Sequence, residues 1–465
     1  MNPQTPSGKE ADTASPTSVI NQTEQLVAHF QRGCKTGPLR IGLEHEKIGV
    51  ALDEDGTVRP VPYADKPGRP QIRALFAGLC THCGCEAVIE GGNTIALTRR
   101  DGAITLEPGG QFELSARPFE LDTECADDMD EHLRELLPLS DRLSIAFLGV
   151  GFRPLGIWND VSWMPKGRYA VMREYLPTRG RLGVEMMKRT ATVQANLDYV
   201  SEADAILKMR VGVGLGPLVT ALYAASPLVD GKPTDFKSYR AHCWLDTDDD
   251  RCGVLPFLWK DGAGFRDYAE WALDVPMFFV YRRGTYTPAG GMTFRRFVLE
   301  GFGNERATLA DWETHLSTLF PDARMKQYVE LRTADAGPLD FVRALPSLWR
   351  GLFYSQSSLL AAWELVKHWS VEERIQVRKD VPKQGFSTQV QGQPIGPLVE
   401  EMVQIARSGL RELGSERGVT LLDPLLLAAK ERRCPADDIL DAWRAVSGEP
   451  RAFVEKVRLR AEKKA

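Results

Sequence analysis

The chain has no excess of positive charge. Its 58 lysine and arginine residues are outnumbered by 63 aspartate and glutamate residues, which gives a net charge of -5 at pH 7. A protein that binds nucleic acid needs Lys and Arg side chains to neutralise phosphates. We therefore expect no nucleic-acid partner. With 465 residues, the chain is long enough for one large unit with a sizeable buried core.

A secretory signal is also lacking. Residues 1–18 are rich in Pro, Ser and Thr and contain no apolar stretch. We expect them to form a disordered tail, and we expect a cytoplasmic protein. After Ser18 the sequence shows neither an internal repeat nor a linker, which favours a single domain over residues 19–465 that is mostly helical from about residue 340.

One uncharged run of 19 residues, VGVGLGPLVTALYAASPLV from Val211 to Val229, has the length of a membrane span. It contains three glycines and two prolines, and the charged segment before it continues the same helical pattern from Ser201. Ser201 with Asp204 three residues later is typical of a helix start. We expect a buried core helix and no membrane partner.

Two motifs look like metal sites but are incomplete. CTHCGC (Cys80 to Cys85) offers Cys and His ligands for zinc, yet no second pair of comparable spacing follows. We interpret its cysteines, and the other five in the chain, as thiols. DTDDDR (Asp246 to Arg251) lacks the glycine and the closing glutamate of a calcium loop, which favours a solvated loop.

Phosphate-binding glycine loops are missing too. The chain has no GxxxxGK[ST] and no GxGxxG between a strand and a helix. The main sequence evidence for a P-loop or kinase type of nucleotide-binding protein is therefore absent. Any nucleotide phosphates would have to be held by metal ions and arginines.

What the sequence does contain is a set of acids inside strand patterns. In IGLEHEKIGV, Glu44 and Glu46 alternate with apolar residues and so point to one face of a strand. They belong either to a solvated strand end or to a site for a divalent cation, which would relieve their repulsion. Glu107 and Glu113 in TLEPGGQFEL, and Glu330 in YVELR, repeat the pattern.

Burying five acids is costly without cations, so a sheet floor that holds hard metal ions explains all of them together. The runs AVIEGGNTIALT and AITLEPGGQFELSA are joined by an Asp101-Gly102 turn, which predicts a hairpin and an antiparallel sheet. Helical periodicity over Val19–Arg32, Asp122–Ile145 and the C-terminal part completes an α+β fold. Mg²⁺ bound by several carboxylates commonly serves a nucleoside triphosphate.

The chain resembles the plant and proteobacterial type of glutamate-cysteine ligase from about Ile41 to at least Leu352. The resemblance is carried by strings in the same order, among them GLEHEKIG, IEGGNTIALT, ITLEPGGQFELS, TATVQANLDY, YRAHCWLDTDDDR, ELRTADAGP and LPSLWRGL. It implies a glutamine synthetase-like antiparallel sheet as active-site floor, two or three Mg²⁺ ions, and ATP as co-substrate. The implied reaction joins glutamate to cysteine and gives γ-glutamylcysteine, the first step of glutathione synthesis.

The resemblance also implies roles for single residues. One metal ion would be held by Glu46, Glu107 and Glu113, and a second by Glu44, Gln194 and Glu330, where Gln194 replaces a histidine common in related ligases. Asn196, Arg240 and Trp244 would bind substrate. Arg332 and Arg168 would contact ATP phosphates or the acyl phosphate. Without the resemblance, the arginines would be taken as surface residues and Trp244 as a core aromatic.

Other interpretations stay open at this point. A ligase of the same fold with another amino acceptor would have the same metal and ATP sites, and a non-catalytic nucleotide sensor could keep the fold. We expect a monomer or a weak homodimer that binds only small molecules. Plant members carry redox-sensitive cysteines where this chain has Ala289 and Arg343, so we expect no plant-like disulfide switch.

Overall fold

The computed structural model describes residues 17–100 and 102–461, so the predicted tail over 1–18 lies outside the described part except for its last two residues. A ten-stranded sheet forms the centre, with the strand order β15-β16-β8-β1-β6-β5-β4-β3, and β2 and β7 also pair with β1. Each pairing in it is antiparallel. The predicted α+β class with an antiparallel floor is confirmed.

The strands of this sheet have the following bounds: β1 Ile41–Leu52, β2 Val58–Pro60, β3 Glu86–Glu90, β4 Asn93–Arg99, β5 Gly102–Leu106, β6 Phe112–Ser115, β7 Ile145–Leu148, β8 Val193–Leu197, β15 Ala323–Met325 and β16 Val329–Leu331. Four small two-stranded sheets pair β9 (Leu228–Val229) with β10 (Lys232–Pro233), β11 (Cys252–Gly253) with β14 (Phe320–Pro321), β12 (Phe279–Arg282) with β13 (Thr285–Pro288), and β17 (Gln389–Val390) with β18 (Gln393–Pro394).

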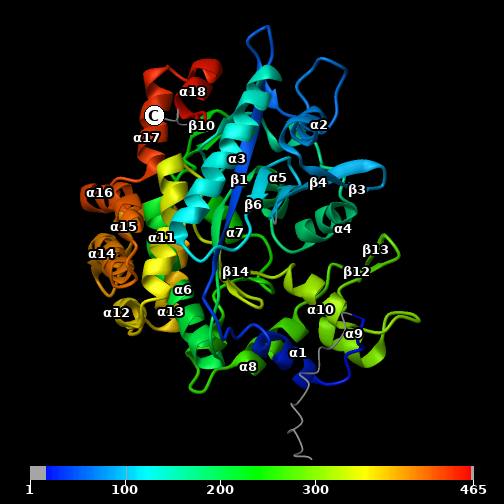
Figure 1. Ribbon diagram of the computed structural model, residues 1–465, viewed down its shortest axis with the longest axis vertical. Helices are drawn as coiled ribbons and strands as arrows, with labels where there is room; N and C mark the ends of the chain where they lie inside the picture. The colour runs from blue at the N-terminus through cyan, green and yellow to red at the C-terminus, as the bar shows by residue number, and fades with distance from the viewer. Residues whose placement is uncertain (1–16, 101, 462–465) are drawn as a thin grey trace, which may run out of the picture.

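The helices are α1 Thr23–Gln31, α2 Ile72–Cys83, α3 Asp122–Arg142, α4 Gly167–Tyr175, α5 Gly183–Arg189, α6 Glu202–Tyr223, α7 Tyr239–Trp244, α8 Phe265–Asp274, α9 Phe294–Glu300, α10 Leu309–Leu316, α11 Leu339–Phe353, α12 Gln356–Val366, α13 Val371–Gln384, α14 Gly396–Glu412, α15 Glu416–Leu421, α16 Asp423–Glu431, α17 Pro435–Ala445 and α18 Pro450–Val457. In Figure 1 the C-terminal helices lie along one side of β1, and α8–α10 lie at the lower end.

The long strand β1 organises the sheet. Its first half pairs with β8 on one edge and β6 on the other, and its second half pairs with β7 and β2. The hairpin predicted at Asp101-Gly102 is confirmed by the pairing of Arg99 with Gly102, although Asp101 itself lies outside the described residues. Arg100 takes a left-handed φ of 52° in this turn.

One face of the central strands is buried against helices α2 and α3. On this face Phe112 contacts Phe76 of α2 and stacks on His132 of α3. Lys47 points the same way, is fully buried, and donates from Nζ to the carbonyl of His45 at 2.8 Å. Burial lowers the pKa of Lys47 to about 7. The acids Glu44 and Glu46 alternate with these residues and therefore occupy the opposite face.

Helix α6 is the buried core helix that the uncharged run predicts. Within the described chain it alone is long and apolar enough to cross a membrane, and 89% of its most apolar 18-residue window is buried inside the protein. Ser201 caps it by accepting a hydrogen bond from the amide of Asp204. The helix ends at Tyr223, before the end of the run, because Pro227 follows and Leu228–Val229 form β9.

The prediction of a solvated loop for DTDDDR holds for Asp249 and Asp250, which are exposed, but not for Asp248 and Arg251. Asp248 and Arg251 are buried and form an ion pair with Nε at 2.6 Å from Oδ2. Arg251 also donates to the carbonyl of Pro276 at 2.7 Å and lies over the ring of Phe278. Two charges of opposite sign three residues apart compensate each other, so these two side chains are buried while Asp249 and Asp250 between them stay at the surface.

Candidate functional site

The register of the sheet brings the predicted acids together on one face. Glu46 of β1 is opposite Glu113 of β6, and Glu44 is opposite Gln194 of β8. One strand further, Asn196 of β8 is opposite Glu330 of β16. Residues directly opposite each other in an antiparallel pair share a face. Residues from four separate parts of the sequence thus form one acidic surface.

Burial and mutual repulsion change the acidity of this surface. Burial, followed by the charges of Glu107 and Glu113, raises the pKa of Glu46 well above its ordinary value. Burial, followed by Glu330 and Glu113, raises the pKa of Glu44 to about 7. Burial also raises the pKa of Glu107, although Lys166 and Arg168 act against it. These carboxylates would all gain from a cation placed among them.

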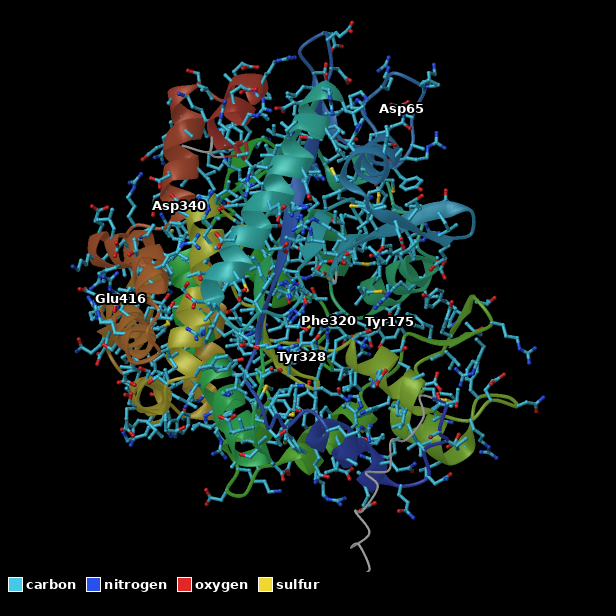
Figure 2. The ribbon with its side chains drawn as sticks, in the orientation of Figure 1. Asp65, Tyr175, Phe320, Tyr328, Asp340 and Glu416 are labelled. Atoms are coloured by element: carbon cyan, nitrogen blue, oxygen red, sulfur yellow. The ribbon has the colours of Figure 1, made fainter. Side chains whose placement is uncertain are left out.

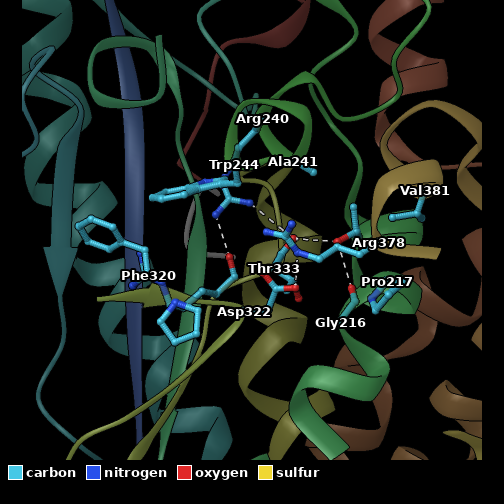
Figure 3. A pocket seen from close by; sticks show the side chains of 13 residues that line it. Gly216, Pro217, Arg240, Ala241, Trp244, Phe320, Asp322, Thr333, Arg378 and Val381 are labelled. Carbon is cyan, nitrogen blue, oxygen red and sulfur yellow. Dashed lines mark hydrogen bonds and ion pairs between the residues drawn. The ribbon is translucent and has the colours of Figure 1, made fainter. Parts of the chain in front are cut away.

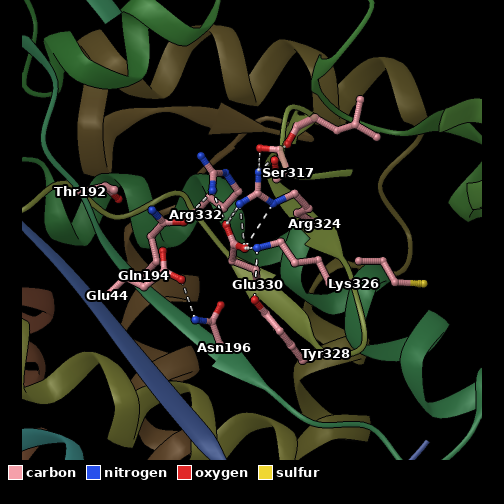
Figure 4. A network of polar contacts seen from close by, with 12 residues as sticks. Glu44, Thr192, Gln194, Asn196, Ser317, Arg324, Lys326, Tyr328, Glu330 and Arg332 are labelled. Carbon is pink, nitrogen blue, oxygen red and sulfur yellow. Dashed lines mark hydrogen bonds and ion pairs between the residues drawn. The ribbon is translucent and has the colours of Figure 1, made fainter. Parts of the chain in front are cut away.

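Glu330 differs from the other acids because it already has cationic partners. Arg324 donates to its two oxygens at 2.6 and 2.9 Å, Lys326 Nζ lies 2.9 Å from Oε2, and Arg332 contacts Oε1 (Figure 4). Although burial acts to raise it, these cations hold the pKa of Glu330 well below its usual range. Arg332 Nη1 also donates to Gln194 Oε1 at 2.7 Å.

A small cavity of about 70 Å³ faces the acids. Its walls bring together Glu46, Glu107, Arg240, Trp244 and Arg332, with Met187 and Thr190 from the segment before β8. Trp244, Arg240 and Arg332 also line a second cavity, which extends towards Asp322 and Arg378 (Figure 3). Phe320, which lines both cavities, lies near the middle of the molecule in Figure 2, whereas Asp65 and Glu416 lie towards its periphery.

Arg240 is held in place by buried acceptors. Its Nη2 donates to the carbonyl of Arg332 at 2.7 Å, and its Nη1 lies 3.6 Å from Asp335 Oδ1. Asp335 is itself fixed, because the hydroxyls of Ser226 and Ser238 donate to it at 2.6 and 2.8 Å. The guanidinium is thus fixed at the wall that the two cavities share.

Arg168 occupies a different place from the other predicted arginines. It lies on α4, with its guanidinium 5.8 Å from the ring centre of Phe279, and its charge acts on Glu107. Its Nε is buried without a hydrogen-bond partner in the described chain. It lines neither of the two cavities described above.

The donor set of the acidic face fits a hard divalent cation. Carboxylate and amide oxygens are the ligands that Mg²⁺ prefers. Asn196 donates to Glu44 at 2.9 Å, while its own Oδ1 is buried and has no hydrogen-bond partner among the described residues. Over residues 17–100 and 102–461, no three acidic, histidine or cysteine side chains form a ready-made cage. Binding would therefore require side-chain movement.

Sequence reasoning missed Arg324, Lys326 and Asp335. In RMKQYVELR, Arg324 and Lys326 are two positions apart, as are Glu330 and Arg332. This period-two spacing on both sides of the turn was the available signal that the charged side chains share a face of the sheet. Asp335 stands in ELRTADAGP, and no local pattern distinguishes it from a surface acid. Its partners Ser226, Ser238 and Arg240 lie about a hundred residues away, at separations of 109, 97 and 95.

The cysteines are free thiols in the structure. Cys80 and Cys83 of α2 are partly buried, and burial raises the pKa of both. Cys243 of α7 is fully buried, and burial raises its pKa as well. A raised pKa makes a thiol less reactive at neutral pH.

The family model of glutamate-cysteine ligase family 2 matches residues 40–456. The chain is 42% identical over 425 residues to "Glutamate--cysteine ligase, chloroplastic" of Nicotiana tabacum, covering 90% of this chain and 79% of that one. It is 42% identical over 431 residues to the protein of the same name from Arabidopsis thaliana, covering 92% and 80%. A crystal structure of glutamate-cysteine ligase from Francisella tularensis in complex with AMP aligns with a TM-score of 0.52 at 11% identity, covering 91% of this chain and 88% of that one, which shows the fold alone.

The names of the relatives bear on two expectations from the sequence, the location of the protein and its activity as an enzyme. Both sequence relatives are named chloroplastic, which contradicts the predicted cytoplasmic location. Both are named as ligases, which excludes a non-catalytic sensor. The chain belongs to glutamate-cysteine ligase family 2, and it is an enzyme that joins glutamate to cysteine to give γ-glutamylcysteine, the first step of glutathione synthesis.

Proposed function

We propose that the chain drives this ligation with ATP, using two or three Mg²⁺ ions on the acidic face of the sheet. The observation that carries the proposal is the cavity between Glu46, Glu107, Arg240 and Trp244. It joins partly buried carboxylates that repel one another to a guanidinium that can bind a substrate carboxylate. The AMP bound to the Francisella tularensis enzyme agrees with nucleotide use on this fold.

ATP is needed because a carboxylate is a poor acylating agent at neutral pH. An oxygen of the γ-carboxylate of glutamate attacks the γ-phosphorus of ATP, the bond from that phosphorus to the bridging oxygen breaks, and ADP leaves. The amine of cysteine then attacks the acyl carbon of the γ-glutamyl phosphate. The carbon–nitrogen bond forms, the carbon–oxygen bond to phosphate breaks, and the amine proton leaves with the phosphate.

The metal ions would be divided between two groups of ligands on the acidic face. Glu46, Glu107 and Glu113 hold one ion, and Glu44, Gln194 and Glu330 hold the second. When bound, Mg²⁺ neutralises the phosphate oxygens that approach the carboxylate. The side chains position these charges in a partly buried site, where electrostatic interactions are stronger than in water.

The remaining roles follow from position and charge. Arg240, fixed by Asp335, binds a carboxylate of glutamate through its guanidinium. Trp244 forms a wall of the cysteine pocket, and its Nε1 has no hydrogen-bond partner in the described structure. Arg332 contacts phosphoryl oxygens from the cavity wall.

Arg168 and Asn196 complete the set. Arg168 contributes charge to ATP phosphates from α4. Asn196 accepts a hydrogen bond from glutamate at its unpaired amide oxygen, or donates one to a phosphate oxygen from its amide hydrogens.

The test is a coupled assay of ADP release with purified protein. We expect ADP release only when ATP, Mg²⁺, glutamate and cysteine are all present, and none when glycine or another amine replaces cysteine. Arg240→Lys should raise the KM for glutamate, whereas Arg266→Lys, at an exposed ion pair with Glu24, should not. ADP release without Mg²⁺, or equal rates with any amine, would overturn the metal or acceptor assignment.

A further inference from the structure

Arg332 connects the two side chains assigned to the second metal ion. Its Nη1 donates to Gln194 Oε1 at 2.7 Å and to Glu330 Oε1 as well (Figure 4). These oxygens come from different strands, β8 and β16. One guanidinium nitrogen therefore lies where a cation that bridges the two oxygens would lie.

The other cations around Glu330 are placed differently. Arg324 approaches from β15 and Lys326 from the turn that follows it, and both contact Glu330. Among the hydrogen bonds of the described residues, neither reaches Gln194. Removing Arg332 from Glu330 would thus leave this buried carboxylate still paired with two cations.

We propose that Arg332 is a tethered cation that occupies the place of the second metal ion until that ion binds, and that the ion releases its guanidinium towards the phosphates. This inference rests on the proposed function, because it takes Gln194 and Glu330 as metal ligands. Mg²⁺ needs its oxygen ligands at about 2.0–2.1 Å. An ion this close to both oxygens would lie where Arg332 Nη1 now lies, between Gln194 and Glu330, so one replaces the other.

Arg332 has further contacts in the site besides Gln194 and Glu330. Arg332 lines both cavities, and its guanidinium carbon lies 5.9 Å from the ring centre of Trp244 and 5.7 Å from that of Phe320. Aromatic faces accept a guanidinium at this range. Arg332 can therefore leave Glu330 and remain in the site, on the wall that faces Glu46 and Glu107.

A consequence is that metal loading and phosphate binding are coupled. The second ion binds more weakly than the first because it must displace Arg332. A phosphate that attracts Arg332 removes this competitor and strengthens the binding of the ion, and the coupling holds equally in the other direction. ATP therefore promotes loading of the second metal ion, in addition to any direct bond from its phosphates to the metal.

The test measures binding of Mn²⁺, as a paramagnetic substitute for Mg²⁺, without nucleotide. Free Mn²⁺ is titrated by electron paramagnetic resonance against wild type, Arg332→Gln and Lys326→Gln. We expect Arg332→Gln to tighten the weaker Mn²⁺ site by about tenfold, within the usual range for coupled ligands. Lys326→Gln removes the same charge from Glu330 without freeing Gln194, and should tighten it by less than about threefold.

The outcomes separate this inference from the proposed function. Equal tightening in both variants, or none in Arg332→Gln, overturns the tethered-cation proposal and leaves the metal assignment intact. If neither wild type nor either variant binds a second Mn²⁺, the metal assignment fails, and this inference fails with it. Should Arg332→Gln unfold, Arg332→Met keeps a long unbranched side chain but loses the charge, and its affinity must still exceed that of wild type.

Discussion

Replacing Glu44 by glutamine should stabilise the metal-free protein and at the same time reduce turnover. Burial, followed by the charges of Glu330 and Glu113, raises the pKa of Glu44 from 4.5 to about 7. The folded state therefore binds this proton more tightly than the unfolded state does. Ionising Glu44 costs folding free energy, and the cost is absent below pH 4.5 and grows until pH 7.

The size of this cost follows from the shift. A change of 2.5 pKa units at about 1.36 kcal/mol per unit gives about 3 kcal/mol. Glutamine keeps the shape and the oxygen that accepts the hydrogen bond of Asn196 at 2.9 Å. Glu44→Gln should thus be more stable than wild type by about 3 kcal/mol at pH 8 and about equally stable at pH 4.5.

Urea unfolding with a chelator at pH 4.5, 6 and 8 measures the stability, and ADP release with Mg²⁺ measures turnover. Turnover should fall by about 10²-fold, as expected when a charged group that acts on the transition state is lost. Added Mg²⁺ should stabilise wild type more than the variant, because only wild type keeps the full ligand set. Glu54→Gln, at an exposed acid after β1, is the matched control and should change neither quantity.

Two results would refute this reasoning. If Glu44→Gln is less stable than wild type at pH 8, Glu44 is not under repulsion in the folded protein. If its turnover is close to normal at limiting Mg²⁺, the residue does not belong to the metal site.

Other outcomes test the remaining buried groups. Asp335→Asn should raise the KM for glutamate by about tenfold with a smaller change in kcat, because Asp335 fixes Arg240 and does not touch the reacting atoms. Steady-state kinetics at varied glutamate concentration measure both constants, and an unchanged KM would contradict the role of Asp335. Burial lowers the pKa of His315 to about 3, so between pH 6.5 and pH 3 only the unfolded state takes up this proton. Wild type should therefore lose about 3 kcal/mol of stability from this group between pH 7 and 4.5, and urea unfolding should show that His315→Gln lacks this loss. Replacing Cys80 and Cys83 together by serine should leave turnover within about twofold of wild type. Dithiothreitol should change wild-type activity by no more than this, since the raised pKa of both thiols disfavours oxidation. A larger reversible effect of dithiothreitol would reveal a redox switch.

Much of the fold was predictable because its signals are local. Alternation in IGLEHEKIGV predicted a strand with Glu44 and Glu46 on one face, and β1 spans Ile41–Leu52. Helical periodicity and the Ser201 cap predicted α6, and the Asp-Gly turn predicted the pairing of β4 with β5. Each of these depends on residues within a few positions of one another.

DTDDDR shows where local reasoning failed. Its composition is that of a solvated loop, and although Asp248 and Arg251 pair within the segment, no local pattern marks these two residues as buried. The reason for burial is non-local, because Arg251 bonds to the carbonyl of Pro276 and lies over Phe278. A charged residue can be buried when a partner is supplied, and here the tertiary structure supplies it.

The sequence by itself determined which residues face the same side of each strand, because side chains alternate along an extended chain. It did not determine which strands are neighbours. Glu46 lies opposite Glu113, and Asn196 opposite Glu330, only because the folded chain sets the register of β1, β6, β8 and β16. Placing Arg332 between Gln194 and Glu330, and Asp335 behind Arg240, required the same long-range packing. Contacts between residues 95 or 138 positions apart depend on the burial of the whole core, which no local pattern encodes.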